Sequence, residues 1–175
     1  KKNVVYIELL VDKEDYPVPC GDYPFLIEER KIIGMRKEVK IVPISDIDLS
    51  ASDFCDLLEA ADYREVPDDC TEAQWDKLSQ LKREQQQQAV AQLKVDVREK
   101  CAYQRAAVLK SYQFRREDLS MRIQSMEDAN IRRMYESQLR SLEEDKDVRL
   151  KELNDIQERA TVEENTIVKG IITVC

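Results

Sequence analysis

The residues of this chain that could do chemistry are mostly carboxylates and cysteines, because the 175-residue sequence contains no histidine. Without histidine, the usual general base is missing, and so are the Ser/His and Cys/His nucleophile pairs. No glycine-rich phosphate-binding motif occurs, and three isolated glycines cannot form a loop that cradles a phosphate. The sequence therefore predicts that this chain is not an enzyme by itself and uses no cofactor.

Runs of carboxylates are the next candidates for chemistry. They occur at Glu28-Glu29, at Asp68-Asp69 and at residues 143–145. Paired carboxylates serve glycosidases and metal hydrolases, but only when the fold brings them together in a cleft. No pattern in the sequence places these residues in a cleft, so we interpret the runs as solvated surfaces.

The five cysteines are Cys20, Cys55, Cys70, Cys101 and Cys175, and no two of them are closer than 15 residues. This spacing and the lack of histidine exclude the common zinc-binding motifs. We interpret the cysteines as reduced thiols of a cytoplasmic protein. A disulfide from Cys55 to Cys70 is the alternative, and it would require an oxidising compartment.

One stretch of the chain is basic within an acidic protein. Residues 98–133 contain nine Lys and Arg against five Asp and Glu, a net charge of +4, whereas the total is -8 and the rest is therefore -12. Aromatic residues are interleaved with these cations, which favours contact with nucleic acid through phosphates. Ion pairing within and between helices, with the tyrosines between them, is the alternative. The candidate contact residues are Arg105, Lys110, Arg115, Arg116, Arg122, Arg132 and Arg133, with Tyr103, Tyr112, Phe114 and Tyr135 among them.

The elements that position these residues are helical. Residues 68–169 contain neither glycine nor proline, and all five prolines precede them. Charged residues make up 37% of the chain and aromatic residues 6%. Such a stretch predicts long helices that bury a narrow stripe rather than a thick core.

We predict that residues 68–160 form a hairpin of two antiparallel helices with a turn near 126–130. Asp128 or Asn130 could cap the second helix. Apolar residues at coiled-coil spacing would form the seam between the helices. The predicted seam residues are Leu109, Tyr112, Leu119, Ile123, Met126, Tyr135, Leu139, Leu142, Leu153 and Ile156.

The two predicted helices differ in length, which leaves two possibilities for the first. It either breaks again near residues 83–89, or its beginning packs on an N-terminal sheet. An apolar stripe over residues 75–97 could alternatively pair between two chains. The beginning of this helix is predicted at Thr71, three residues before Gln74, as in a capping box.

Residues 1–67 predict a small α+β base. Strands are expected at 4–11, from Phe25 onward, and at 39–42 with an end at Pro43, while 31–35 either continue the second strand or form the next one. A helix capped by Ser50 or Ser52 should end before Pro67, where a linker at 66–69 follows.

Residues 161–175 close the predicted fold. The sequence at 167–174 is typical of a strand, which could join the base, with residues 4–11 as its neighbour. The predicted fold class is therefore α+β: a small base, a projecting antiparallel coiled-coil hairpin and a C-terminal strand that returns to the base. There is no apolar run near 18 residues, so no membrane partner is expected. The chain begins without Met and ends in an apolar run, and we expect it to be a segment of a longer protein.

The order of these elements resembles the C-terminal accessory region of bacterial Snf-type helicase-like ATPases. The residues that carry the resemblance are the apolar strand at 4–11, the segment at 129–135 that opens the second helix, and the strand at 167–174 with its Gly170. The resemblance implies an accessory part of a DNA- or RNA-dependent ATPase whose catalytic motifs lie upstream, so no catalytic residue is carried over.

We therefore expect a non-catalytic interaction module whose partners are the rest of its parent protein and either nucleic acid or another protein. The rival interpretation is a structural coiled coil that forms a homodimer through helical stripes and has no nucleic-acid role. Salt should separate the two, because phosphate contacts weaken steeply with salt and apolar contacts do not.

Overall fold

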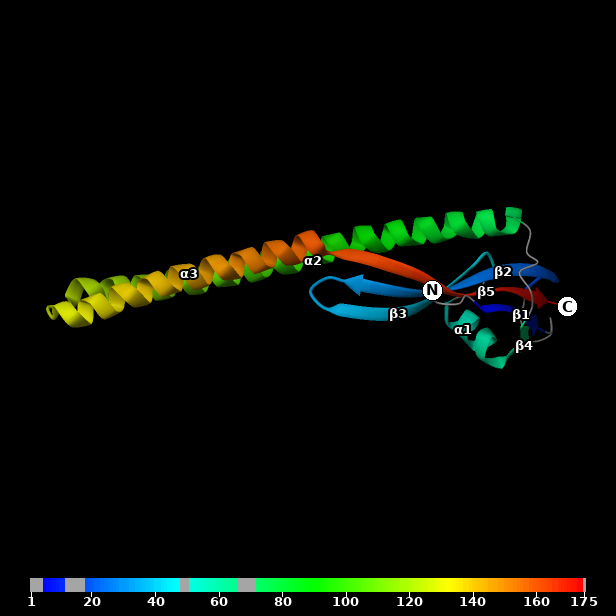
Figure 1. Cartoon of the computed structure of the whole chain (residues 1–175), viewed down its shortest axis with the longest axis horizontal. Helices are drawn as coiled ribbons and strands as arrows, with labels where there is room; N and C mark the ends of the chain where they lie inside the picture. Colours follow the sequence, from blue (N-terminus) through cyan, green and yellow to red (C-terminus); the bar gives the residue numbers. More distant parts are fainter. Residues whose placement is uncertain (1–4, 12–17, 48–50, 66–71, 175) are drawn as a thin grey trace. The chain divides into compact units, whose positions relative to one another are not determined.

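The computed structural model describes residues 5–11, 18–47, 51–65 and 72–174. In chain order, the elements are β1 (Val5–Val11), β2 (Gly21–Ile33), β3 (Lys37–Ser45), α1 (Ala51–Ala60), β4 (Asp62–Glu65), α2 (Glu72–Ser125), α3 (Ala129–Arg159) and β5 (Thr161–Val174). The fold is α+β, as the sequence predicts, with a five-stranded mixed sheet and three helices (Figure 1).

The chain forms two compact units. The first, the sheet unit, comprises Lys1–Ala91 and Val162–Cys175, and the second, the helix-pair unit, comprises Gln92–Thr161. The first twenty residues of α2 thus belong to the sheet unit, whereas the sequence placed the boundary at residues 67 and 68. The physical reason is that this end of α2 carries apolar side chains that pack on the sheet.

The strand order in the sheet is β3-β2-β5-β1-β4. Strand β5 runs parallel to β1, with Val5 opposite Val168 and Val11 opposite Val174. The C-terminal strand therefore lies beside the first strand, the neighbour that the sequence suggested. Strands β3 and β4 form the two edges of the sheet, each antiparallel to its neighbour.

One sequence expectation about the strands needs correction. The strand expected to end at Pro43 continues to Ser45, with Pro43 opposite Ile27. Proline has no backbone N–H and cannot donate a hydrogen bond to a neighbouring strand. An edge strand tolerates it where the backbone nitrogen faces the open side of the sheet. The segment 31–35 continues β2 as far as Ile33, which is one of the two alternatives that the sequence left open. The short edge strand β4, which is exposed along its length, was not anticipated.

Helices cover both faces of the sheet. Neighbouring residues of a strand point to opposite faces, and in β2 Phe25 packs with Phe54 and Leu57 of α1, while Leu26 packs with Leu78 of α2. Figure 1 shows α1 and the beginning of α2 on opposite sides of the strands. The beginning of α2 therefore packs on the sheet, and α2 has no break near residues 83–89.

Gly170 in β5 interrupts a run of β-branched residues for a steric reason. A Cβ atom at this position would lie 2.5 Å from the carbonyl oxygen of Ile7 and would overlap the ring of Phe25. Gly170 is directly opposite Ile7 in the parallel β1–β5 ladder. Because Gly170 has no side chain, the ring of Phe25 can lie directly against the backbone of β5 in the core.

Several sequence expectations fall outside the described residues. These are the cap at Ser50, the linker at 66–69, the capping-box residue Thr71, and the cysteines Cys70 and Cys175. Ser52 lies inside α1 rather than before it.

Candidate functional site

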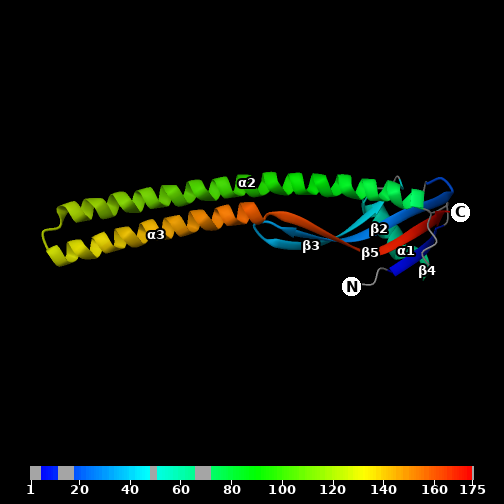
Figure 2. The same cartoon turned by 45° about the horizontal axis from the view of Figure 1, so that its top comes forward.

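The helix-pair unit contains most of the predicted contact residues. Both views show α3 alongside the second half of α2 (Figures 1 and 2). The helices run antiparallel, because the contacts pair Cys101 with Leu153 and Arg122 with Tyr135. Only residues 126–128 connect them, within the predicted turn.

Asp128 begins α3, one of the two caps that the sequence proposed. Its carboxylate oxygen Oδ1 accepts hydrogen bonds from the backbone N–H groups of Asn130, at 2.7 Å, and Ile131, at 3.2 Å. Arg132 then donates to the carbonyl oxygen of Met126 at 2.6 Å. These bonds satisfy backbone groups that a helix end and a turn otherwise leave unpaired.

One predicted seam residue is misplaced. Leu109 is 47% exposed, while Val108 beside it is half-buried. The seam is set by Cys101, which is fully buried and whose thiol lies 3.5 Å from the carbonyl oxygen of Leu153. Residues that face a neighbouring helix follow one another at spacings of three and four residues. Counted from Cys101, such spacings reach residues 105, 108 and 112, so residue 109 is not part of the face that contacts α3. The other predicted seam residues, from Tyr112 to Ile156, are buried or half-buried.

Three of the candidate cations are engaged with groups of their own chain. Arg105 donates to Asn154 and Gln157 of α3, Arg122 pairs with Asp118 at 3.0 Å, and Arg132 binds Met126. The hydrogen bond to Tyr135 and then the contact with Asp118 raise the pKa of Arg122 above its already high ordinary value. These cations mainly stabilise the helix pair.

The remaining candidates, Lys110, Arg115, Arg116 and Arg133, are exposed and make no side-chain hydrogen bond or ion pair within the described part of the chain. They do not form a single patch. Successive helical residues are 100° apart, so Arg115 and Arg116 lie on opposite sides of the seam residue Tyr112. A ligand on one side of the helix pair can reach only part of this set.

The interleaved aromatic residues separate into two groups. Tyr112 donates to Glu143 at 3.1 Å, and the ammonium group of Lys146 lies 4.7 Å from the centre of its ring. Tyr135 contacts Arg122. Tyr103 and Phe114 are instead 79% and 75% exposed. Two of the four aromatic residues thus form helix–helix contacts, and two are available to a partner.

A hollow on this unit is lined by Arg105, Asn154, Gln157 and Glu158. Its volume is about 240 Å³, below the roughly 300–1,000 Å³ of typical ligand pockets. Arg105 already donates to two of the lining residues. The side chains of α2 and α3 that line this hollow thus already contact one another.

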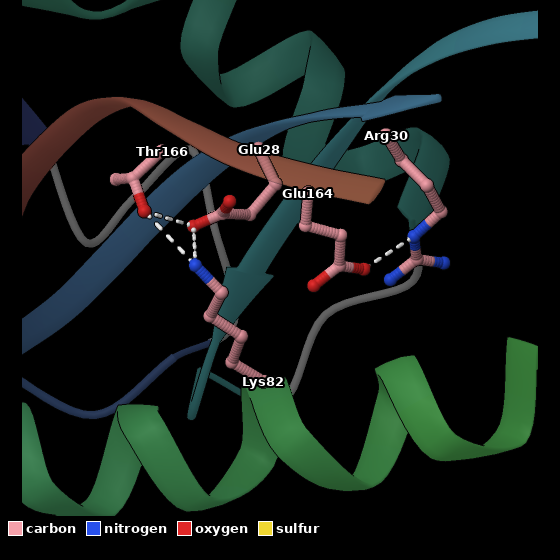
Figure 3. A network of polar contacts seen from close by, with 5 residues as sticks. All are labelled: Glu28, Arg30, Lys82, Glu164 and Thr166. Carbon is pink, nitrogen blue, oxygen red and sulfur yellow. Dashed lines mark hydrogen bonds and ion pairs between the residues drawn. The ribbon is translucent and has the colours of Figure 1, made fainter. Parts of the chain in front are cut away.

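A buried charge cluster lies in the sheet unit, where the sequence predicted only a solvated surface (Figure 3). Glu28 of β2 is fully buried, and its Oε1 accepts from the ammonium group of Lys82 at 2.8 Å and from the hydroxyl of Thr166 at 2.5 Å. Arg30 binds Glu164 of β5 at 2.6 Å. The interpretation of Glu28 as a solvated carboxylate was therefore wrong.

This cluster joins three elements of the sheet unit. Glu28 and Arg30 come from β2, Glu164 and Thr166 from β5, and Lys82 from α2. Two carboxylates and two cations balance in charge, yet Glu28 Oε2, Arg30 Nη2 and Glu164 Oε2 are buried without a hydrogen-bond partner. The contact between Glu28 and Lys82 therefore joins α2 to the sheet, and the contact between Arg30 and Glu164 joins β2 to β5.

The sequence offered one signal for this cluster. Leu26 and Glu28 share a face of β2, and Leu78 and Lys82 are four residues apart on α2. Periodicity alone could not show that these two faces meet.

The apolar stripe at 75–97, proposed as a surface between chains, is occupied within the chain. Leu78 is fully buried against Leu26 and Ile44, and Val97 is 2% exposed. Trp75 packs on the same cluster, and the ammonium group of Lys169 lies 5.0 Å from its ring centre. This stripe is therefore not an exposed pairing surface.

The other chemistry-bearing groups are dispersed. Cys20 and Cys55 are exposed free thiols, and Cys101 is buried. Among the described residues, no three or more Cys, Asp or Glu are grouped as a metal ion would require. No helix in the described parts of the chain is both long and apolar enough to cross a bilayer.

Comparison of the chain with protein-family models and with curated proteins found no significant match.

Proposed function

We propose that this chain is a non-catalytic interaction module, an accessory part of a larger nucleic-acid-dependent ATPase, whose helix pair contacts the phosphate backbone of nucleic acid. The observation that carries the proposal is the set of exposed, uncommitted cations Lys110, Arg115, Arg116 and Arg133. The parent ATPase is inferred from the resemblance in element order.

The charge distribution supports the helix pair as the contacting part. The helix-pair unit contains 15 Lys and Arg against 14 Asp and Glu, a net charge of +1, so from the total of -8 the sheet unit carries -9. Phosphates would be repelled by the sheet unit and attracted only where cations are locally in excess. Binding should therefore be weak and independent of base sequence.

The reach of the cations matches a short stretch of backbone. The contact between Arg122 and Tyr135 places Arg133 near the level of residue 124 of α2. From Arg116 to that level is about 12 Å at 1.5 Å per residue, or roughly four base pairs at 3.4 Å each. Lys110 lies on the face of α2 away from α3 and is not part of this stretch. Arginine guanidinium groups suit phosphate because they donate in a planar fork.

We also propose that α2 and α3 form an antiparallel coiled-coil hairpin over residues 92–159. The steps of four, three and four residues through Cys101, Val108 and Tyr112 support this assignment. In this proposal the seam residues give the pair its rigidity, and the exposed faces carry the contacts with partners.

Fluorescence anisotropy with a labelled 20-base-pair DNA and its single strand tests the function. The decisive variant changes Arg115, Arg116 and Arg133 together to Gln. If the duplex contacts two of these three cations, the part of the set that one side of the helix pair can present, log K should fall with log salt at a slope of about -1.8, a loss of roughly sevenfold between 50 and 150 mM salt. The variant should lose both the binding and most of this slope.

A matched control removes the same number of charges elsewhere. Arg36, Lys37 and Lys40 are exposed residues at the β2–β3 turn and on β3. Their combined change to Gln should leave binding within about twofold. Absence of binding at 50 mM salt, or equal losses in the two triple variants, would overturn the nucleic-acid proposal.

The second candidate function is an oligomerising scaffold without a nucleic-acid role. It is favoured by the exposure of Tyr103 and Phe114. These two side chains lie about 20° apart around α2, and exposed apolar side chains that gather on one face can mark an interaction site.

A further inference from the structure

A row of side chains on α2, here called the outer stripe, faces away from α3. It consists of Tyr103, Ala107, Lys110, Phe114, Glu117 and Met121. At 100° per residue these positions lie within about 40° of one line along the helix, and the seam residues Cys101 and Tyr112 lie about 160–180° from it. Tyr103, Phe114 and Met121 are 79%, 75% and 63% exposed.

The spacing of the outer stripe is that of a second coiled-coil seam. Its members follow at steps of four, three, four, three and four residues, the a/d pattern of a heptad repeat. Large apolar side chains occupy its two ends and centre. Most flanking positions are small or uncharged, as at Ala106, Ser111, Gln113 and Ser120, so a second helix could approach closely. The charged flanking residue Asp118 is paired with Arg122 of its own helix.

We propose that the outer stripe is a docking surface for the outer stripe of a second copy of this chain, with the two α2 helices antiparallel. The inference does not depend on the proposed contact with nucleic acid. It rests on the self-complementarity of the stripe about Tyr112, the residue midway between its ends.

Antiparallel pairing brings complementary groups together. In the register centred on Tyr112, Tyr103 faces the partner's Met121, and Lys110 faces the partner's Phe114. Sulfur–aromatic and cation–π contacts are both favourable arrangements. Lys110 also lies one layer from the partner's Glu117, within reach of an ion pair.

Parallel pairing would have the opposite effect. In a parallel coiled coil, equivalent positions face each other, so Lys110 would face the partner's Lys110 and Glu117 the partner's Glu117. Two like-charged pairs in the seam would oppose association. The charges of the stripe therefore select the antiparallel orientation.

The size of the stripe sets the expected affinity. Each aromatic side chain can bury about 150–250 Å², so the four aromatic residues of two copies supply roughly 600–1,000 Å². This is below the low end of stable interfaces, about 1,200 Å². The dimer should consequently be reversible, with a dissociation constant in the micromolar range or weaker.

Sedimentation equilibrium of the full chain between about 1 and 300 μM tests the association. We expect a monomer–dimer equilibrium that Phe114→Asp weakens at least tenfold. The matched control is Val148→Asp, at a 58% exposed residue of α3 outside the stripe, which should leave the equilibrium within twofold. A chain that stays monomeric throughout, or equal effects of the two variants, overturns the proposal.

A charge exchange tests the pairing itself and does not depend on removing apolar surface. Lys110→Glu and Glu117→Lys should each weaken the dimer. The double variant should recover part of the lost association, because the exchanged charges remain complementary between copies while the contact of Lys110 with the partner's Phe114 is lost. Circular dichroism verifies that each variant keeps its helices. Failure of the double variant to recover association would contradict the proposed register.

Disulfide cross-linking distinguishes the two orientations. Gln113 lies one residue from the centre of the antiparallel register, so Gln113→Cys should cross-link to its partner equivalent on oxidation. Gln124→Cys, on the same helix face, would lie about 36 Å from its equivalent at 1.5 Å per residue, and should not cross-link. Both variants need a background in which Cys20, Cys55, Cys70 and Cys175 are Ser. Cross-linking at position 124 would indicate a parallel dimer and overturn the proposal.

Discussion

The buried pair of Glu28 and Lys82 should make a large and asymmetric contribution to the stability of the sheet unit. Glu28 is fully buried, whereas the Lys82 side chain is 26% exposed. Lys82→Met leaves the carboxylate buried with the Thr166 hydroxyl as its remaining described partner. Glu28→Gln instead leaves an ammonium group that can turn toward water.

The magnitude follows from this difference in burial. Removal of one partner from a buried ion pair costs about 3–5 kcal/mol, and we expect the lower end, about 3 kcal/mol, for Lys82→Met because Thr166 still donates. For Glu28→Gln we expect about 1–2 kcal/mol, the cost of weakened hydrogen bonds. A loss of 3 kcal/mol should lower Tm by about 12 °C in a unit of about 100 residues.

Urea unfolding followed by tryptophan fluorescence measures the losses in the free energy of unfolding of the sheet unit. Trp75 is the only tryptophan of the chain and packs on the cluster that includes Leu26 and Leu78. The matched control is Lys77→Met, because Lys77 pairs with Asp46 at 2.9 Å but is 66% exposed. Exposed pairs contribute about 0–1 kcal/mol.

Two results would refute the reasoning. The first is a loss for Lys82→Met no larger than that for Lys77→Met. The second concerns the double variant, Glu28→Gln with Lys82→Met. It removes the uncompensated charge and should cost less than the sum of the single variants. Full additivity would show that the two side chains do not act as a pair.

Three further outcomes test the fold. Gly170→Ala should destabilise the sheet unit by about 1–3 kcal/mol in urea unfolding, because a methyl group has no room between β1 and the core; an unchanged midpoint would contradict this. Asp128→Ala should cost about 1 kcal/mol in thermal circular dichroism through loss of the cap on α3, and Glu127→Ala should cost less than half of that. Leu153→Ala should lower the free energy of unfolding by about 2–5 kcal/mol. A comparable loss for Leu109→Ala would contradict the exposure of Leu109 and support its predicted place between the helices.

Local signals explain what the sequence alone determined. The absence of glycine and proline from residues 68–169 predicted long helices, and the polar segment before Asn130 located the turn, because helix breaking and capping depend on neighbours within a few residues. The β-branched run around Gly170 predicted the C-terminal strand for the same reason. The α+β class follows from these local features.

Contacts between distant residues explain what only the tertiary structure decided. Glu28 belongs to a charge run that resembles any solvated surface, and its burial depends on Lys82 and Thr166, which are 54 and 138 residues away. The strand β4 exists because β1 offers a free edge, although its own residues carry no apolar alternation.

The faces of α2 are decided in the same way. Heptad spacing is present both in the seam through Cys101 and Tyr112 and in the outer stripe through Tyr103 and Phe114. Helical periodicity shows that such faces exist, but the position of α3 determines which one is buried and which remains for a partner.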